Sequence, residues 1–352
     1  MARDTTRRDT TGPGATTRVD RARPTRKRWV RAAAAVAGVT VCLATASVGH
    51  AVNEARRAAP GDAGPSPSPD KTWTSRDAAA YWTPDRMAAA APAGSDTPAR
   101  PEAPTPSTAT TRSAVPKGAA AAARAGRTAR HFNGIPSVGV LFSVDGDTKA
   151  HHCTASVVHS PHGNLILTAG HCNPGTRAAF VPQYRSGATT QPHGVWAIED
   201  TFAYPERGTS GAGADLDFAF ATVAPDEDDR TLEEVTGGNT LSPTPGYTND
   251  VTVIGYPNVR NDPEDRAVRC ATRTGRLSGT HELRMECGGF YGGTSGSPWL
   301  SDFDEDSGTG RIIGVIGGLN GGGPKGPDAD RISYSPYFGS KILNLYARAA
   351  EK

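Results

Sequence analysis

The sequence lacks a strong excess of charge of either sign, with 38 Lys and Arg against 36 Asp and Glu and a formal net charge of +2. This balance gives no reason to expect nucleic acid as a partner. Cysteine is also scarce, and its five copies include no Cys-x-x-Cys spacing, which argues against a zinc site. Two acidic turns, at 226–234 and 302–306, are better read as solvated turns than as calcium loops, because Ser307 stands where an EF-hand loop needs glycine. We therefore expect no metal and no cofactor.

Long hydrophobic runs are absent except at 32–49, an uncharged stretch rich in Ala and Val that follows an Arg- and Lys-rich segment at 1–31. A basic region before an apolar stretch is typical of a secretory signal, and Gly49-His50-Ala51 offers a cleavage site after Ala51. The run is at the lower limit for a membrane-spanning helix, so a retained anchor is the alternative. We predict that 1–51 is a signal peptide or signal anchor and that the remainder lies outside the cytoplasm. The protein would be secreted or, as the alternative, anchored on the outer face of the cell membrane.

Residues 52–130 have little that could form a core, because Ala, Pro, Thr, Ser and Gly dominate. We predict a disordered, low-complexity pro-segment or linker. One aromatic island at 73–87 has the pattern of a helix starting at Ser75, and it could dock on a folded domain or serve as a short interaction element. Arg124, Arg127 and Arg130 lie among small residues and would suit cleavage by another protease, so the chain is predicted to be a zymogen.

Residues 131–352 show few helical periods and many short β-branched or apolar runs separated by Gly, Pro, Asn and Asp. This pattern predicts an all-β sandwich or barrel. Strands are expected at 137–144, 153–159, 165–168, 195–198, 217–223, 251–256, 281–286 and 311–316. The exception is 340–348, where Ile342, Leu345 and Tyr346 share one helical face and predict a C-terminal helix.

Apart from Cys42 in the apolar run, four cysteines remain, and an even number in an exported chain predicts two disulfides. Three pairings are possible. We favour the sequential one, Cys153–Cys172 and Cys270–Cys287, because it closes two loops of fewer than about 20 residues.

Segment 292–299 (Gly-Gly-Thr-Ser-Gly-Ser-Pro-Trp) holds Ser295 among glycines, which permit backbone conformations that can expose a hydroxyl beside free N–H groups. Upstream, 165–172 (Leu-Ile-Leu-Thr-Ala-Gly-His-Cys) is an expected buried strand that ends in a turn carrying His171, and histidine is the usual base for a serine hydroxyl. An aspartate at the start of the 217–223 strand could orient that histidine. Asp215 and Asp217 are expected on one face of the strand, so composition does not choose between them.

The chain order His171, Asp217, Ser295 differs from the orders of subtilisin-type chains and of α/β-hydrolases. With 168–172 (Thr-Ala-Gly-His-Cys) and 293–298 (Gly-Thr-Ser-Gly-Ser-Pro), it resembles the trypsin/chymotrypsin-like serine proteases. The likeness is greater to the secreted trypsin-like peptidases of actinobacteria and to the glutamyl-endopeptidase-like branch. It covers about residues 135 to 350.

The resemblance implies two six-stranded antiparallel β-barrels, with the catalytic residues in the cleft between them, and a C-terminal helix. His171 would be the general base, Asp217 its orienting carboxylate because 217–220 matches the family's Asp-x-Ala-x, and Ser295 the nucleophile. The N–H groups of Gly293 and Ser295 would form the oxyanion hole. Cys153–Cys172 matches the family disulfide that brackets the histidine.

The expected function is therefore a secreted serine endopeptidase that acts on polypeptides through an acyl-enzyme, as a monomer, within a domain at 131–352. The alternative is a catalytically silent protease-fold protein that binds peptides at the cell surface.

Three positions depart from the family pattern. Thr294 replaces the aspartate that pairs with a new N-terminus in trypsins, so activation by that ion pair is not expected. Gly289 replaces the acidic residue six positions before the serine, and 313–318 lacks the histidine of glutamyl endopeptidases. No preference for basic or acidic substrates is expected. Phe290, Ile316 and the glycines at 317–318 suggest a small or apolar specificity pocket instead.

Overall fold

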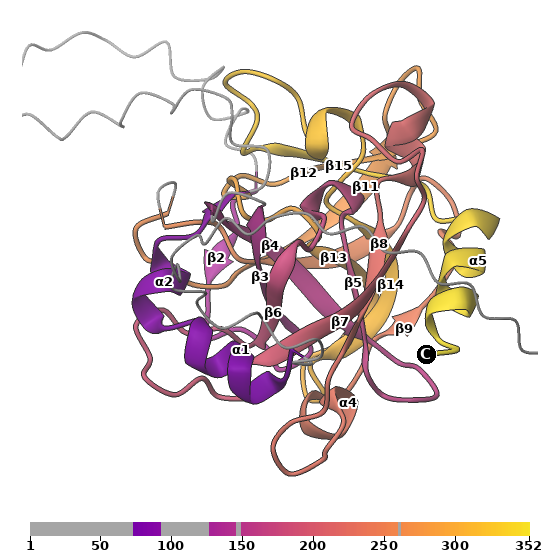
Figure 1. Ribbon diagram of the computed structural model, residues 1–352. Coiled ribbons are helices and arrows are strands. Elements are labelled where there is room, and N and C mark those ends of the chain that lie inside the picture. Colours follow the sequence, from indigo (N-terminus) through magenta and orange to yellow (C-terminus); the bar gives the residue numbers. More distant parts are fainter. Residues whose placement is uncertain (1–72, 93–126, 146–148, 260–261) are drawn as a thin grey trace, which may run out of the picture. The chain divides into compact units, whose positions relative to one another are not determined.

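The computed structural model describes residues 73–92, 127–145, 149–259 and 262–352. The described chain is built around two mainly antiparallel β-sheets, each rolled around its own hydrophobic core (Figure 1). The predicted segment 1–51 lies outside the described residues, and so does most of 52–130.

The first sheet closes into a six-stranded barrel. Its strands run in the order β4, β3, β6, β7, β8, β5, and β5 pairs back with β4. The strands are β3 (Val138–Asp145), β4 (Lys149–Val158), β5 (Leu165–Thr168), β6 (Thr176–Pro182), β7 (Trp196–Ala203) and β8 (Ala219–Val223). All residues of β5 and β8 are buried. One face of each strand points into the barrel core, and a second hydrophobic cluster covers the other face.

The second sheet follows the order β15, β12, β11, β10, β13, β14. Its strands are β10 (Asp250–Gly255), β11 (Val268–Arg276), β12 (Leu283–Glu286), β13 (Pro298–Asp304), β14 (Thr309–Val315) and β15 (Ile332–Ser335). The two ends of the sheet meet where the Val315 N–H donates to Ser335 Oγ at 3.0 Å and the Gly317 N–H donates to the Tyr334 carbonyl at 3.1 Å. Two short strands add to it: β2 (Arg130–His131) pairs with the start of β11, outside this order, and β9 (Thr240–Leu241) pairs with β14 at the end of the sheet.

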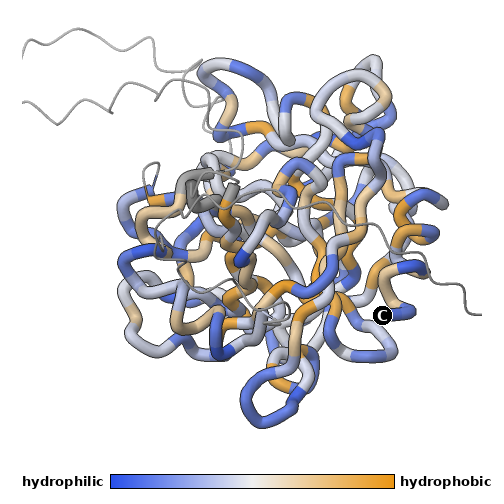
Figure 2. The backbone as a smooth tube through the Cα atoms, viewed as in Figure 1, coloured by the Kyte–Doolittle hydropathy of each residue, from blue (hydrophilic) through white to orange (hydrophobic). Residues whose placement is uncertain are grey.

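Hydrophobic residues follow the strands of both barrels, and the long loops are mostly hydrophilic (Figure 2). The fold class expected from the sequence, all-β with a C-terminal helix, is confirmed. That helix is α5 (Ser340–Ala349), which buries Ile342 and Leu345 and packs beside β7 and β8. Tyr346, on the same face, meets Phe220 with ring centroids 5.9 Å apart. Another short helix, α4 (Leu232–Thr236), begins at a capping box between Thr231 and Glu234. None of the helices in the described ranges is long and apolar enough to cross a membrane.

The aromatic island forms two short helices, α1 (Ser75–Tyr81) and α2 (Pro84–Ala88), followed by β1 (Ala91–Pro92). Thr74 caps α1 with a capping box and Thr83 caps α2 ahead of Pro84, a residue suited to the first helical turn. The island belongs to the same compact unit as the barrels and lies against the first one (Figure 1). This part of 52–130 is therefore folded, because its aromatic residues find an apolar surface to cover.

Candidate active site

His171 lies in a single 3-10 turn, η1 (Gly170–Cys172), directly after β5. The turn is anchored on one side by the fully buried strand and on the other by the Cys172–Cys153 disulfide, which ties it to β4. Gly170 is required here, because a Cβ on it would lie 2.7 Å from Arg207 Cδ and 3.1 Å from an oxygen of Asp217. The sequential disulfide pairing is the one in the structure, with Cys270 bonded to Cys287 in the second barrel.

Asp217 is fully buried and receives three N–H groups. The backbone N–H of His171 donates to Oδ1 at 2.7 Å, the Gly318 N–H donates to Oδ2 at 2.7 Å, and His171 Nδ1 lies 2.8 Å from Oδ2. An ionised carboxylate only accepts hydrogen bonds, so this contact places a proton on Nδ1. In neutral histidine, Nε2 is then left as the lone-pair nitrogen.

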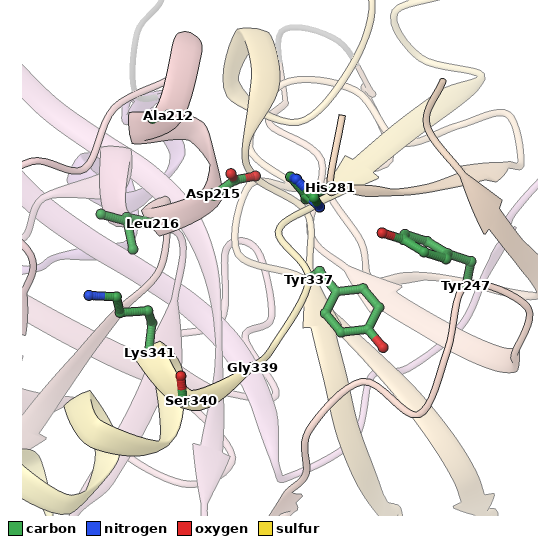
Figure 3. Close-up of a pocket in the computed structure, with 9 residues that line it drawn as sticks. All are labelled: Ala212, Asp215, Leu216, Tyr247, His281, Tyr337, Gly339, Ser340 and Lys341. Carbon is green, nitrogen blue, oxygen red and sulfur yellow. The ribbon is translucent and has the colours of Figure 1, made fainter. Parts of the chain in front are cut away.

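The structure distinguishes between the two aspartates that the sequence left open. Asp217 contacts His171, whereas Asp215 lines a cavity of about 490 Å³ and points toward His281 (Figure 3). The expectation that both share a strand face is wrong. Asp215 lies in the 3-10 turn η2 (Gly211–Leu216) and Asp217 caps its end, two residues before β8 begins at Ala219. A turn rotates successive side chains differently from a strand, so the two carboxylates diverge.

Ser295 lies in a tight turn between the two barrels. Its carbonyl accepts the Thr154 N–H from β4 at 2.8 Å, and the next N–H, that of Gly296, donates to Ile316 at 2.7 Å. Gly296 has a φ of +84°, and a Cβ there would lie 2.2 Å from the Thr154 carbonyl oxygen and 2.3 Å from Thr168 Oγ1. The serine turn can approach β4 and the end of β5 this closely only because residue 296 is glycine. The serine turn is thereby held at the end of β5, the strand that leads to His171.

Gly293 has a φ of +100°, and Asn258 packs so tightly against it that a Cβ would lie 2.7 Å from the Asn258 nitrogen. The Asn258 N–H donates to the Gly292 carbonyl at 2.8 Å, which fixes the peptide that precedes Gly293. Among the described residues, the N–H groups of Gly293 and Ser295 donate to no protein acceptor. Unpaired N–H groups in a fixed turn can stabilise an oxyanion.

Thr294 is buried, and its hydroxyl donates to the Tyr291 carbonyl at 2.7 Å, a contact that closes the turn on itself. Phe290 and Ile316, which the sequence suggested as parts of a specificity pocket, belong to the hydrophobic core of the second barrel. The apolar character of these side chains therefore contributes to packing of the barrel.

Glu282 had no role in the sequence analysis, yet it lies at the site. It is 1% exposed, and its Oε1 accepts the Leu319 N–H at 2.8 Å. The consecutive N–H groups of Gly318 and Leu319 thus hold two carboxylates, those of Asp217 and Glu282. Burial raises the pKa of Glu282 to about 7, opposed by the Leu319 hydrogen bond, and the charges of Asp215 and Asp217 raise it as well. A glutamate just before a strand has no local pattern that would single it out.

The loop whose Leu319 N–H binds the Glu282 carboxylate also lies beside His171. It includes the 3-10 turn η3 (Leu319–Gly321), and the Asn320 N–H donates to the Thr209 carbonyl of the first barrel at 2.8 Å. A Cβ on Gly321 would lie 3.9 Å from His171 Nε2. The loop therefore packs beside the nitrogen that carries the lone pair.

Comparison with known proteins agrees with this fold. Residues 153–315 match the family model of the trypsin-like peptidase domain. The protease Anisep from Arthrobacter nicotinovorans has a similar structure, with 23% identity, a TM-score of 0.55, and coverage of 64% of this chain and 100% of that one. A thermostable serine protease, AL20, from an extremophilic microorganism is 24% identical with a TM-score of 0.50, covering 62% of this chain and 98% of that one. A search of curated proteins by sequence finds no match.

The matched stretch is therefore a trypsin-like peptidase domain, and the protein is a serine endopeptidase. Its substrates are peptides.

Proposed function

We propose that this endopeptidase cleaves peptide bonds through His171, Asp217 and Ser295 with a covalent acyl-enzyme intermediate. The observation that carries the proposal is the set of three N–H groups on the buried Asp217 carboxylate, two of them from His171. An oriented imidazole with its lone pair on Nε2 is what a serine nucleophile requires.

In the proposed reaction, Nε2 of His171 accepts the proton of Ser295 Oγ as the oxygen attacks the substrate carbonyl. The N–H groups of Gly293 and Ser295 stabilise the oxyanion, each contributing about 3 kcal/mol to the transition state. The imidazolium, stabilised by Asp217, then protonates the leaving amine as the acyl-enzyme forms. Water, deprotonated by the same imidazole, hydrolyses the ester and frees the serine.

A fluorophosphonate probe tests this proposal, because it reacts only with an activated serine. Wild-type protein should be labelled at Ser295, and the Ser295→Ala variant should not. Folding of both proteins is checked by their melting temperatures. If the folded, mature wild type remains unlabelled, the domain is a catalytically silent peptide-binding protein, which is the alternative function.

The proposal includes export, with 1–51 acting as a signal peptide and 52–130 as a pro-segment, and action as a monomer outside the cell. The two disulfides support an oxidising environment. N-terminal sequencing of the cell-free protein tests the signal cleavage after Ala51. Recovery of the chain only in the membrane fraction, with 32–49 intact, would instead identify an anchor.

A further inference from the structure

The segment 73–92, within the proposed pro-segment, belongs to the hydrophobic cluster that covers the outside of the first barrel. Trp82 is 1% exposed and packs on Phe142 of β3, with ring centroids 5.1 Å apart. Ala78, Met87 and Ala90 join the same hydrophobic cluster. A segment that only blocks a cleft would leave the barrel complete when it departs, whereas departure of this one would expose Phe142 to water.

The same segment also pairs with backbone groups of the barrel. The indole N–H of Trp82 donates to the Arg177 carbonyl and that of Trp73 to the Ala178 carbonyl, both at 2.8 Å. Ser75 Oγ donates to the Ala224 carbonyl at 3.3 Å and accepts the Ala197 N–H at 3.2 Å. These contacts join the segment to β6, to β7 and to the end of β8, so its binding is both apolar and directional.

The end of the segment reaches a residue that touches the proposed oxyanion hole. Strand β1 pairs in parallel with β4, and the Asn258 side-chain amide donates to the Ala90 carbonyl. The backbone of the same Asn258 holds the Gly292 carbonyl and packs against Gly293. A continuous chain of contacts thus runs from Ala90 through Asn258 to the turn whose N–H groups form the proposed oxyanion hole.

We propose that residues 73–92 are a permanent part of the active enzyme, which stays bound to the first barrel when the chain is cut between this segment and Arg127. The proposal rests on the proposed function, since the segment would support the oxyanion hole through Asn258. Under this proposal, maturation does not remove the segment from the enzyme. Cleavage would separate the segment from the domain in sequence, and the mature enzyme would consist of two chains held together without a covalent bond. Cysteine is absent from 73–92.

Cutting the chain on purpose tests retention. The recognition sequence of an unrelated, highly specific protease is placed at 101–106 in the full chain, and the exported protein is cut and passed over a size-exclusion column. We expect the fragment containing 73–92 to co-elute with the domain, with kcat/KM within about twofold of the uncut protein. In denaturant the two pieces should separate. A fragment that leaves under native conditions while kcat/KM stays or rises would overturn the proposal.

Substitution of Trp82 tests the packing. In the cut protein, Trp82→Ala should release the fragment and lower the melting temperature by about 10 °C, given the cost of removing a buried tryptophan in a domain of this size. Trp82→Phe keeps most of the ring and is the matched control that should retain the fragment. Release of the fragment by both variants, or by neither, would contradict the role of Trp82 in holding the segment on the barrel.

Asn258→Ala tests the link to the site, because Asn258 acts as a positioning residue. We expect kcat to fall about tenfold with KM nearly unchanged, since only the transition state uses the oxyanion hole. A fall in melting temperature with kcat unchanged would contradict this role. Retention is measured by elution and melting, so its failure is distinguishable from failure of Ser295 labelling, which concerns the proposed function alone.

Discussion

The two barrels fix their shares of the site by different means. The first barrel holds His171 through side chains: a buried strand, a disulfide at the next residue and the carboxylate of Asp217. The second barrel holds Ser295 through backbone conformation, with glycines at positive φ on both sides of it. Substitutions on the first side should therefore act on proton transfer, whereas those on the second should act on the geometry of the turn.

The largest effect is expected from the Asp217 carboxylate. Asp217→Asn should lower kcat about 10⁴-fold, because an amide in this place would favour the wrong histidine tautomer. Asp215→Asn is the matched control two residues away, and it should leave kcat within about threefold. Steady-state kinetics on a peptide substrate measures both. Equal losses in the two variants would remove the distinction between the aspartates.

Next in size is the effect of a methyl group in the serine turn. Gly296→Ala would place a Cβ 2.2 Å from the Thr154 carbonyl oxygen, so the turn must move away from β4. We expect a loss of several kcal/mol in the free energy of unfolding and at least about a hundredfold in kcat. Gly187→Ala is the matched control, because Gly187 also has a positive φ of +69° but has nothing within 4 Å of the added atom.

That control should cost only about 1 kcal/mol, the strain of a non-glycine residue at positive φ. Denaturant titration and kcat together decide the outcome. If the two alanine variants behave alike, close approach of the serine turn to β4 is not what requires glycine at 296.

The two disulfides separate stability from activity. They span 19 and 17 residues, so removing either one should cost a similar amount, about 3 kcal/mol of unfolding free energy. Only the pair Cys153→Ala with Cys172→Ala should also lower kcat, because Cys172 directly follows His171. The pair Cys270→Ala with Cys287→Ala serves as the control. Loss of kcat in both double variants at a temperature where both are folded would contradict this local effect.

Local patterns predicted the histidine and serine turns well, because a glycine-flanked serine and a histidine after a buried strand owe their geometry to neighbours in sequence. Composition did not choose between Asp215 and Asp217, and only the family motif at 217–220 favoured Asp217. The reason the two carboxylates diverge was not foreseen, because what looked like a strand start is the 3-10 turn η2. Glu282 could not be predicted either, because its role depends on the Leu319 N–H, 37 residues away.

The strands show the same limit. Those rich in Val, Ile, Leu or Phe, such as β3 and β5, were expected near their observed positions. Strands β6, β11, β13 and β15 were missed. In β11 and β15 the buried positions include Thr272, Thr274, Ser333 and Ser335. A hydroxyl can enter the interior when it finds an acceptor, as Thr272 does at the Glu286 carbonyl, and that acceptor is invisible in the sequence.

The smallest effect concerns Glu282 and the pH. In the unfolded chain its carboxyl ionises near its ordinary pKa of 4.5, whereas in the fold its pKa is about 7. The folded protein therefore keeps a proton that the unfolded chain loses. The stability that this proton provides is fully present below pH 4.5 and is lost as the pH rises through 7.

Glu282→Gln cannot ionise, so its stability relative to wild type should rise by about 2 kcal/mol between pH 5 and pH 8. Any fixed cost of the buried amide cancels in this difference between two pH values. Glu286→Gln, four residues further along the chain but with its side chain 63% exposed, is the matched control and should show no such change. Denaturant titrations at the two pH values measure the effect. Parallel pH profiles for wild type and Glu282→Gln would mean that the carboxylate beside Asp217 is already ionised at pH 5, and the second barrel would then present a permanent negative charge to the site.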